Sequence, residues 1–244
     1  MTPPLTAAGF ESPSLASPGK RAAYEWKFLL DEDLAGTVED WARRCLSLDP
    51  HGDPALGGAY RTTSLYLDTP RMDVYRRTLP YARQKFRVRR YGLGPWVFLE
   101  RKAKEDDRVR KRRTPVHEAE LARLAGRAAS GDWAGRWFRH NLDRRRLGPA
   151  CRVTYLRKAY AGWGVAGPLR LTLDRNVQGT LADDFGLAPV EIGLPLLPGR
   201  VVLELKFRRV LPAVFTDFLD EMGLTVSAVS KYRRCREAWG VADA

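Results

Sequence analysis

Several short segments of this chain alternate charged and apolar residues with a period of two, which is the pattern of β-strands that have one charged face. In residues 85–89, Lys85, Arg87 and Arg89 share one face of such a strand. Phe86 and Val88 fall on the opposite face. The same alternation recurs in residues 24–28, 100–104, 169–174 and 202–208. A chain with this pattern must bury the apolar faces of many strands, so we expect a fold dominated by a β-sheet.

A charged strand face has two ordinary explanations. Taken singly, it faces water, as in any antiparallel sheet that is covered on one side only. The repetition of charged faces over many strands favours a second arrangement, a closed barrel whose charged faces line the lumen while helices cover the apolar outside. We therefore predict an α+β fold built on a closed antiparallel β-barrel. Cations at this density repel one another in a confined space, which predicts an occupant with many negative charges.

The overall charge agrees with an anionic partner. Lys and Arg number 42 against 29 Asp and Glu among the 244 residues, which gives a formal net charge of +13. Charge alone does not distinguish nucleic acid, an acidic membrane surface and a phosphorylated small molecule. The length fits one large barrel domain and also allows two smaller domains.

The cysteines and the hydropathy pattern indicate a reduced, cytoplasmic setting. Cys45, Cys151 and Cys235 are odd in number and widely spaced, with no CxxC pair, so neither a disulfide framework nor a zinc site is expected. The first residues lack the apolar run of a signal peptide. Nowhere does the chain hold about 18 consecutive apolar residues, so no transmembrane segment is expected.

The pattern divides the chain into a tail and one domain. Residues 1–21 are rich in Pro, Ser and Ala, which predicts a disordered N-terminal tail, and residues 22–240 form the expected domain. Strands are predicted at residues 24–30, 62–68, 85–91, 96–102, 152–160, 169–174 and 201–208. Helices are predicted at residues 38–46 behind an acidic start, from Thr114 to about Ala129, from Pro212 to Gly223, and at residues 228–239.

Eight segments in order resemble one known family. They are residues 25–27, 64–68, 87–92, 99–102, 155–160, 169–174, 203–206 and 230–232. Together they follow the pattern of the vacuolar transporter chaperone (VTC) domain, the polyphosphate polymerase domain within the CYTH or triphosphate-tunnel superfamily. The resemblance spans almost the whole expected domain.

The resemblance implies a tunnel that binds ATP, transfers its terminal phosphoryl group to a growing polyphosphate chain, and uses a divalent metal, Mn²⁺ or Mg²⁺. The residues that match the family's phosphate-binding cations are Lys27, Arg87, Arg89, Lys102, Arg157, Arg170 and Lys231. Lys111 matches a further one, with Arg110 as the alternative.

The metal ligands are expected among the carboxylates of the charged strands. Glu204 matches the family's metal-binding carboxylate. Glu25 and Glu100 are either further metal ligands, since hard oxygen donors suit Mn²⁺ and Mg²⁺, or salt-bridge partners of neighbouring lysines. Both alternatives stay open at this point.

One departure from the wider superfamily bears on the reaction. Its hydrolases and cyclases commonly begin with Glu-x-Glu-x-Lys, whereas this chain has Glu25, Trp26 and Lys27, and a lysine at this position favours the polymerase branch. The alternatives are a triphosphatase on the same fold and a non-catalytic module that binds polyphosphate, inositol phosphates or RNA. Nucleic acid is not the expected partner. The resemblance leaves open a separate integral-membrane partner beside which the enzyme would work.

The remaining charged residues and the histidines are expected to have surface or structural roles. Solvated surface positions are predicted for Lys85, Lys104, Arg112, Arg113 and Lys206. Structural roles are predicted for His51, His117 and His140, which lie outside the charged strands.

Overall fold

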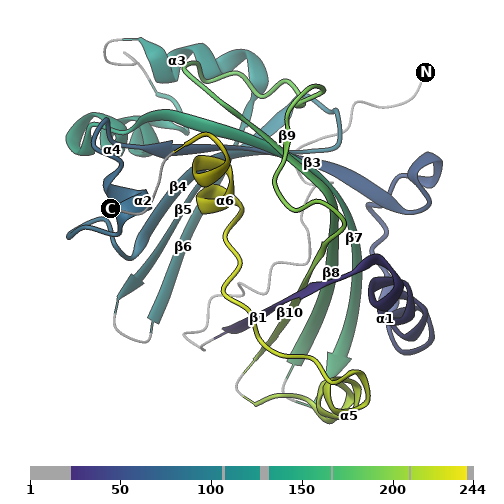
Figure 1. Ribbon diagram of the computed structural model, residues 1–244. Helices are drawn as coiled ribbons and strands as arrows, with labels where there is room; N and C mark the ends of the chain where they lie inside the picture. Colours follow the sequence, from purple (N-terminus) through teal and green to yellow (C-terminus); the bar gives the residue numbers. More distant parts are fainter. Residues whose placement is uncertain (1–22, 106–107, 127–131, 166, 209, 241–244) are drawn as a thin grey trace. The chain divides into compact units, whose positions relative to one another are not determined.

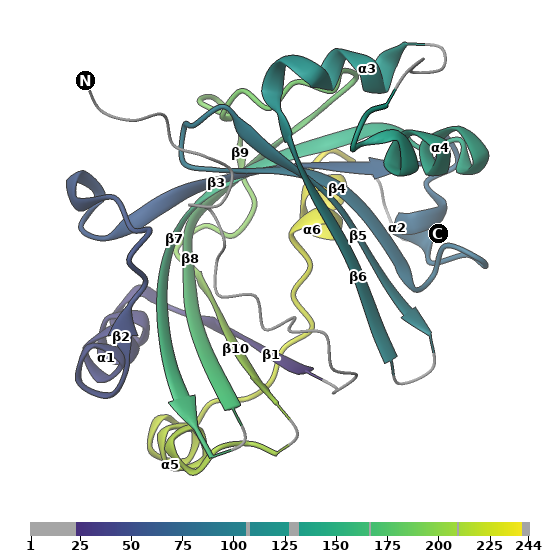
Figure 2. The same cartoon turned by 180° about the vertical axis from the view of Figure 1, so that it is seen from behind.

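The computed structural model describes residues 23–105, 108–126, 132–165, 167–208 and 210–240 (Figures 1 and 2). The predicted tail, residues 1–21, lies outside these ranges. The chain forms two compact units. The first comprises Met1–Tyr60, Leu156–Arg175 and Gly199–Val229, and the second comprises Arg61–Tyr155, Asn176–Pro198 and Ser230–Ala244. Strands β7 (Gly148–Gly164) and β8 (Gly167–Leu181) contribute residues to both units, and the single domain expected over residues 22–240 stays a prediction.

The first unit is an antiparallel sheet covered by two helices. Its elements are β1 (Ala23–Leu30), α1 (Glu32–Cys45), β2 (Ser47–Leu48), the short 3₁₀ helix Pro54–Leu56, parts of β7 and β8, β10 (Val201–Arg208) and α5 (Ala213–Met222). Strand β10 pairs with β1 on one side and with β8 on the other. The register sets Phe28 beside Leu203 and Leu203 beside Leu173, so apolar side chains form continuous rows on one face.

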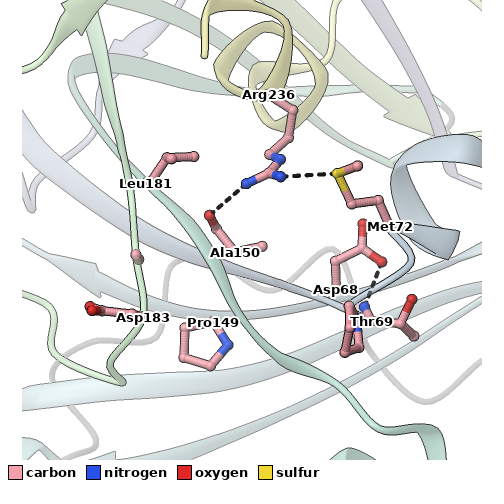
Figure 3. A pocket seen from close by; sticks show the side chains of 10 residues that line it. Asp68, Thr69, Met72, Pro149, Ala150, Leu181, Asp183 and Arg236 are labelled. Carbon is pink, nitrogen blue, oxygen red and sulfur yellow. Dashed lines mark hydrogen bonds between the residues drawn. The ribbon is translucent and has the colours of Figure 1, made fainter. Parts of the chain in front are cut away.

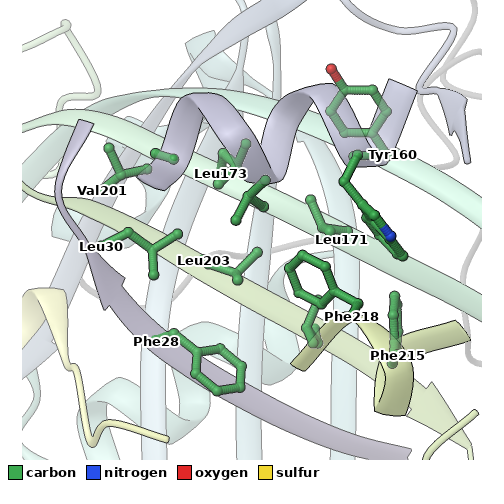
Figure 4. Packing of buried hydrophobic residues seen from close by; sticks show 14 of the residues in the cluster. Phe28, Leu30, Tyr160, Leu171, Leu173, Val201, Leu203, Phe215 and Phe218 are labelled. Carbon is green, nitrogen blue, oxygen red and sulfur yellow. The ribbon is translucent and has the colours of Figure 1, made fainter. Parts of the chain in front are cut away.

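Helices α1 and α5 cover this apolar face (Figure 4). The sequence begins α1 by an N-cap, because the Asp31 side chain accepts a hydrogen bond of 2.8 Å from the backbone N–H of Leu34. Trp41 of α1 lies with its ring centroid 4.3 Å from that of Phe218 of α5, and both side chains are buried. Helix α5 ends at Gly223, whose φ of 58° is the left-handed conformation that glycine adopts readily. The core of this unit thus leaves the other face of its sheet to polar residues.

The second unit holds the remaining antiparallel strands of the same sheet, together with shorter helices. Its elements are most of β3 (Ala59–Asp68), α2 (Asp73–Arg76), β4 (Gln84–Tyr91), β5 (Trp96–Glu105), β6 (Arg108–His117), the 3₁₀ helix Glu118–Leu121, α3 (Ala122–Ala125), α4 (Arg136–Arg145), the remaining parts of β7 and β8, β9 (Leu194–Pro195) and α6 (Lys231–Ala238). The strands lie in the order β7-β3-β4-β5-β6. Among the described helices of both units, none is long and apolar enough to cross a membrane.

The α+β class and the antiparallel sheet are confirmed, but the closed barrel is wrong. Over the described residues, the hydrogen-bonded strand order is β1-β10-β8-β7-β3-β4-β5-β6, so β1 and β6 are end strands of an open sheet. A closed barrel requires its first and last strands to pair. The alternation of charge along a strand shows which face is polar, but it carries no information on whether the two end strands meet.

The expected helix from Thr114 to about Ala129 is also wrong in its first part. Strand β6 continues through Thr114 and Pro115 to His117, and helical structure begins only at Glu118. Proline lacks a backbone N–H, but β6 is an end strand, where a missing donor is tolerated. The last part of that prediction, residues 127–129, lies outside the described residues. The C-terminal helix is confirmed, although it starts at Lys231 rather than at residue 228.

The aromatic contact between α1 and α5 provides a test of the first unit's core. We expect Phe218→Ala to lower the free energy of unfolding by about 3–5 kcal/mol, because it leaves a cavity beside Trp41 in a fully buried position. Urea denaturation followed by tryptophan fluorescence measures the change. Val210→Ala, at a position that is 70% exposed, is the control and should change stability little. Equal effects of the two substitutions would contradict the packing described.

Candidate functional site

One face of the second unit's sheet gathers most of the cations predicted on β4, β5 and β6. The register places Arg87 beside Glu100 and Glu100 beside Arg113, so these three side chains share one face across three strands. Arg89 is two residues from Arg87 and lies on the same face, where it pairs with Ser64 of β3. We call this surface the β4–β6 face.

Glu100 holds the arginines of this face together. Its two carboxylate oxygens lie 2.5 Å from Nε of Arg87 and 3.4 Å from Nε of Arg113. Burial alone would raise the pKa of Glu100, but Arg87, Arg89 and Arg113 outweigh it and lower the pKa to about 2. Glu100 is therefore an ionised counter-ion between arginines, which supports the salt-bridge alternative for this residue, although its predicted partners were lysines.

Two arginines of the face are fixed by further contacts. Nε of Arg89, a buried residue, donates a hydrogen bond of 2.9 Å to Oγ of Ser64. The guanidinium of Arg113 lies 3.6 Å from the centroid of the Phe98 ring, a close cation–π contact. Arg113 was predicted to be a solvated surface residue. The sequence analysis missed its role because the run of cations at residues 110–113 gives no sign of which members face inward.

The register also distinguishes Lys111 from Arg110. Lys111 pairs with Lys102 of β5, and Lys102 is two residues from Glu100 and so lies on the same strand face. Both predicted lysines therefore lie on the β4–β6 face. Arg110 pairs with Ala103 and falls on the opposite face of β6. Lys85 is exposed, as predicted, and its pairing with Lys102 places it on the β4–β6 face. Arg112 falls on the opposite face and lies 4.2 Å from the Trp137 ring centroid.

Lys231 is positioned by the start of α6. The Ser230 side chain caps this helix, and the Lys231 ammonium lies 4.7 Å from the centroid of the Tyr155 ring. The next residue, Tyr232, donates a hydrogen bond to the buried carboxylate of Asp68. Asp68 also accepts hydrogen bonds from the backbone N–H groups of residues 69, 74 and 75. This carboxylate therefore ties the first turn of α6 to the end of β3 and fixes where Lys231 lies.

The polar face of the first unit carries a second cluster, with cations and carboxylates in alternation. Nζ of Lys27 lies 3.2 Å from Glu204 and 3.5 Å from Glu25. Nζ of Lys206 lies 3.1 Å from Glu204 and 3.9 Å from Glu25. Lys206 was predicted to be solvated surface, but it shares both carboxylates with Lys27.

Arg157 and Arg170 extend this cluster, and each has a carboxylate partner that the sequence analysis did not select. Arg157 donates two hydrogen bonds, of 2.6 and 2.7 Å, to the carboxylate of Asp174, whose residue is fully buried. Arg170 donates one of 2.6 Å to Asp49. Asp174 could have been found from its position on the Arg170 face of its strand, but Asp49 lies far away in sequence and its pairing requires the fold.

The structure thus brings the predicted residues into two clusters. Lys27, Arg157, Arg170, Glu25 and Glu204 lie in the first unit. Arg87, Arg89, Lys102, Lys111, Lys231 and Glu100 lie in the second, the first four cations on the β4–β6 face with Glu100.

The carboxylates do not form a ready metal cage. Across the described ranges, no group of three or more His, Cys, Asp and Glu side chains is placed to hold a metal ion. Glu25 and Glu204 nevertheless offer hard oxygen donors around a shared pair of lysines. Mg²⁺ and similar ions are commonly bound by one or two carboxylates together with substrate phosphates, so these two residues fit a metal that arrives with a phosphorylated substrate. Glu100 fits less well, because Arg87 and Arg113 already occupy both of its oxygens.

A pocket of about 540 Å³ in the second unit contains none of the predicted site residues (Figure 3). Pro70, Pro149 and Leu181 give it an apolar lining, and Arg236 lies at its edge. The Arg236 guanidinium donates a hydrogen bond of 3.2 Å to the backbone oxygen of Ala150 and contacts Sδ of Met72 at 2.9 Å. The pocket is therefore separate from the two charged clusters.

The fold defined by these elements resembles that of two solved proteins. One is a proposed adenylyl cyclase from Hippeastrum with a dominant triphosphatase activity, at 15% identity and a TM-score of 0.53 over 89% of this chain and 96% of that one. Another is a proposed adenylate cyclase from Bacillus halodurans, at 12% identity and a TM-score of 0.51 over 86% of this chain and 94% of that one. At these identities the likeness concerns the fold alone.

The chain belongs to the VTC domain family, whose model matches residues 22–239. The resemblance seen in the sequence is thereby confirmed. Comparison with curated proteins gave no significant match.

The pairing of Glu100 with two arginines predicts an acid-sensitive contribution to stability. The pKa of Glu100 falls from an ordinary 4.5 to about 2 in the folded protein, so its ionised form stabilises the fold above pH 4.5 and this contribution is lost as the pH falls toward 2. We expect Glu100→Gln to lower the free energy of unfolding by about 3 kcal/mol at neutral pH. The difference between the two proteins should shrink on acidification.

Urea unfolding at neutral pH and near pH 3 measures this change. Glu221→Gln, which removes an exposed carboxylate from α5, is the matched control and should leave the acid sensitivity unchanged. The assignment fails if Glu100→Gln and the parent protein lose stability in parallel as the pH falls.

Proposed function

We propose that this protein is a polyphosphate polymerase that transfers the terminal phosphoryl group of ATP to the end of a growing polyphosphate chain. One observation carries the proposal: on the β4–β6 face, among the described side chains of these three strands, cations greatly outnumber carboxylates. The cations are Lys85, Arg87, Arg89, Lys102, Lys111 and Arg113, six in all, and the one carboxylate is Glu100. Such an excess is costly unless a polyanion is bound.

The charge balance differs in the first unit, and the difference suggests a division of roles. There, Lys27, Lys206, Arg157 and Arg170 have carboxylate partners in Glu25, Glu204, Asp174 and Asp49, four against four. A balanced set of this kind suits a substrate phosphate together with a divalent metal, which bring negative and positive charge at once. The unbalanced β4–β6 face suits a phosphate chain by itself.

The proposed reaction needs positioning and charge neutralisation more than a protein nucleophile. A terminal oxygen of the polyphosphate chain attacks the γ-phosphorus of ATP, a new P–O bond forms, the bond to the β-phosphate oxygen breaks, and ADP leaves. The acceptor oxygen is already ionised near neutral pH, so no general base has to remove a proton. Arginines such as Arg87 and Arg89 would hold the phosphate oxygens by charge-assisted hydrogen bonds.

A metal ion fits this proposal at Glu204, with Glu25 as a second ligand. Bound there, Mn²⁺ or Mg²⁺ would neutralise negative charge on the transferred phosphoryl group. Lys27 and Lys206, which now contact both carboxylates, would then be available to phosphate oxygens. Lys27 itself is the residue that sets this chain apart from the Glu-x-Glu-x-Lys hydrolases and supports a polymerase over a triphosphatase.

A triphosphatase is the second candidate, because the Hippeastrum protein of the same fold has that activity. The two reactions differ only in the acceptor, a phosphate chain or water. Incubation with ATP and Mn²⁺ followed by gel electrophoresis tests them: we expect long polyphosphate and an equivalent release of ADP. Free phosphate without polymer would replace the polymerase with a hydrolase, and tight ATP binding without turnover would replace both with a binding module.

Lys111 and Arg110 form a matched pair that tests the site itself. Both are exposed cations on β6, but only Lys111 shares the β4–β6 face. We expect Lys111→Ala and Arg89→Ala each to lower kcat/KM by about 10- to 100-fold, because each removes a charge-assisted phosphate contact of about 1.5–3 kcal/mol. Arg110→Ala should leave kcat/KM within about two-fold of the parent enzyme.

Steady-state ADP release measures these effects, and circular dichroism confirms that each variant is folded. Equal losses for Lys111→Ala and Arg110→Ala would show that the assay senses net charge rather than this face. Unchanged activity in both Lys111→Ala and Arg89→Ala would remove the β4–β6 face from the reaction.

A further inference from the structure

A second group of arginines lies in the second unit at the loop after α2 and the end of α4. In both views of the fold, α2 and α4 lie at the same edge of this unit (Figures 1 and 2). We call this surface the loop–helix patch. Its exposed arginines are Arg76 at the end of α2, Arg77 and Arg83 from the loop after it, and Arg144 and Arg146 from the end of α4.

The two segments of the patch are joined by direct contacts. The Tyr81 hydroxyl donates a hydrogen bond of 3.1 Å to the backbone oxygen of Arg145. Within the loop, Oγ1 of Thr78 donates one of 2.7 Å to Asp73, and Nε2 of Gln84 donates one of 3.2 Å to the backbone oxygen of Pro80. The exposed arginines are therefore presented together on a structured surface.

Like charges also crowd beneath this surface. The guanidiniums of Arg101 and Arg145 lie 5.8 and 5.9 Å from the centroid of the same ring, that of Phe86. Burial, Arg144 and Arg101 together lower the pKa of Arg145. Few carboxylates offset this charge: Asp143 lies 2.6 Å from Arg139, and Asp73, which accepts hydrogen bonds from Thr69 and Thr78, interacts electrostatically with Arg76. Positive charge is thus in excess, and a negatively charged partner would relieve it.

An apolar residue projects from the same loop. Leu79 is 87% exposed and stands between Arg77 and Arg83, next to the exposed Pro80. A leucine adds nothing to the recognition of a soluble phosphate chain, since it can neither donate a hydrogen bond nor attract an anion. An exposed leucine in the same loop as exposed arginines suits the interface of a bilayer, where the leucine reaches the acyl chains and the arginines reach headgroup phosphates.

We propose that the loop–helix patch binds the surface of an anionic lipid bilayer, with Leu79 entering the interface and the surrounding arginines contacting headgroup phosphates. This site is independent of the proposed polymerase reaction, because it uses none of the residues placed on the β4–β6 face. It would hold the protein against a membrane surface.

Vesicle co-sedimentation of the full chain tests the proposal. We expect binding to vesicles of phosphatidylcholine with phosphatidylserine, and little to phosphatidylcholine alone. The double substitution Arg144→Gln with Arg146→Gln should weaken binding by about 25-fold, since each basic residue near an anionic surface contributes about five-fold. Leu79→Ser should weaken it by roughly ten-fold through the loss of apolar insertion.

Two controls separate this surface from general electrostatics and from phosphate binding. Arg44→Gln with Arg200→Gln removes the same charge from exposed positions in the first unit and should change vesicle binding by less than about two-fold. Leu79→Ser should leave the binding of inorganic tripolyphosphate unchanged. The proposal is overturned if both double substitutions weaken vesicle binding equally, or if Leu79→Ser has no effect while the Arg144 and Arg146 substitutions abolish tripolyphosphate binding, which would make the patch a site for free phosphate chains.

Discussion

The repulsion between cations on the polar strand faces of the two units is the constraint on which the rest of this structure depends. A β-strand places every second side chain on the same face, so a strand such as β4 sets Arg87 and Arg89 side by side. Carboxylates relieve this repulsion in both units, but to different degrees. Glu204 and its neighbours balance the first cluster, whereas Glu100 alone serves the β4–β6 face. The sheet is stable with this excess because its other face packs apolar side chains, and the remaining attraction for anions is what function can use.

The apolar faces allow the polar faces to be so highly charged. Burial of side chains such as Phe28, Leu203 and Phe218 in the first unit stabilises the sheet independently of its polar side. The pair of Arg157 and Asp174 shows what the burial of charge requires. Two charges taken out of water need nearly ideal geometry, which here consists of two short hydrogen bonds. In the first unit, Lys27, Lys206, Arg157 and Arg170 each have a carboxylate partner, which also fixes the direction of the cationic side chain.

Much of the fold was predictable from the sequence because period-two alternation is a local signal. The strands around residues 85–91 and 201–208 were found in this way, and the helix after Pro212 was found from apolar residues at helical spacing. What the sequence could not supply depends on pairing between distant segments. The closed barrel was wrong because closure is decided by β1 and β6, and the helix at Thr114 was wrong because an end strand tolerates Pro115. Asp49, which pairs with Arg170 across 121 positions, was missed for the same reason.

The run at residues 110–113 shows most clearly where local reasoning ends. Arg110, Lys111, Arg112 and Arg113 are all cations, so alternation of charge cannot assign their faces, and a shift of one residue would exchange all four. The pairing of β5 with β6 removes the ambiguity, since it sets Glu100 beside Arg113 and Lys102 beside Lys111. The carboxylate of Glu100 favours this register energetically. A slip of one residue would turn Arg113 to the opposite face of β6 and break its ion pair with Glu100. One largely buried acid therefore selects which cations of the run share the β4–β6 face and which lie on the opposite face.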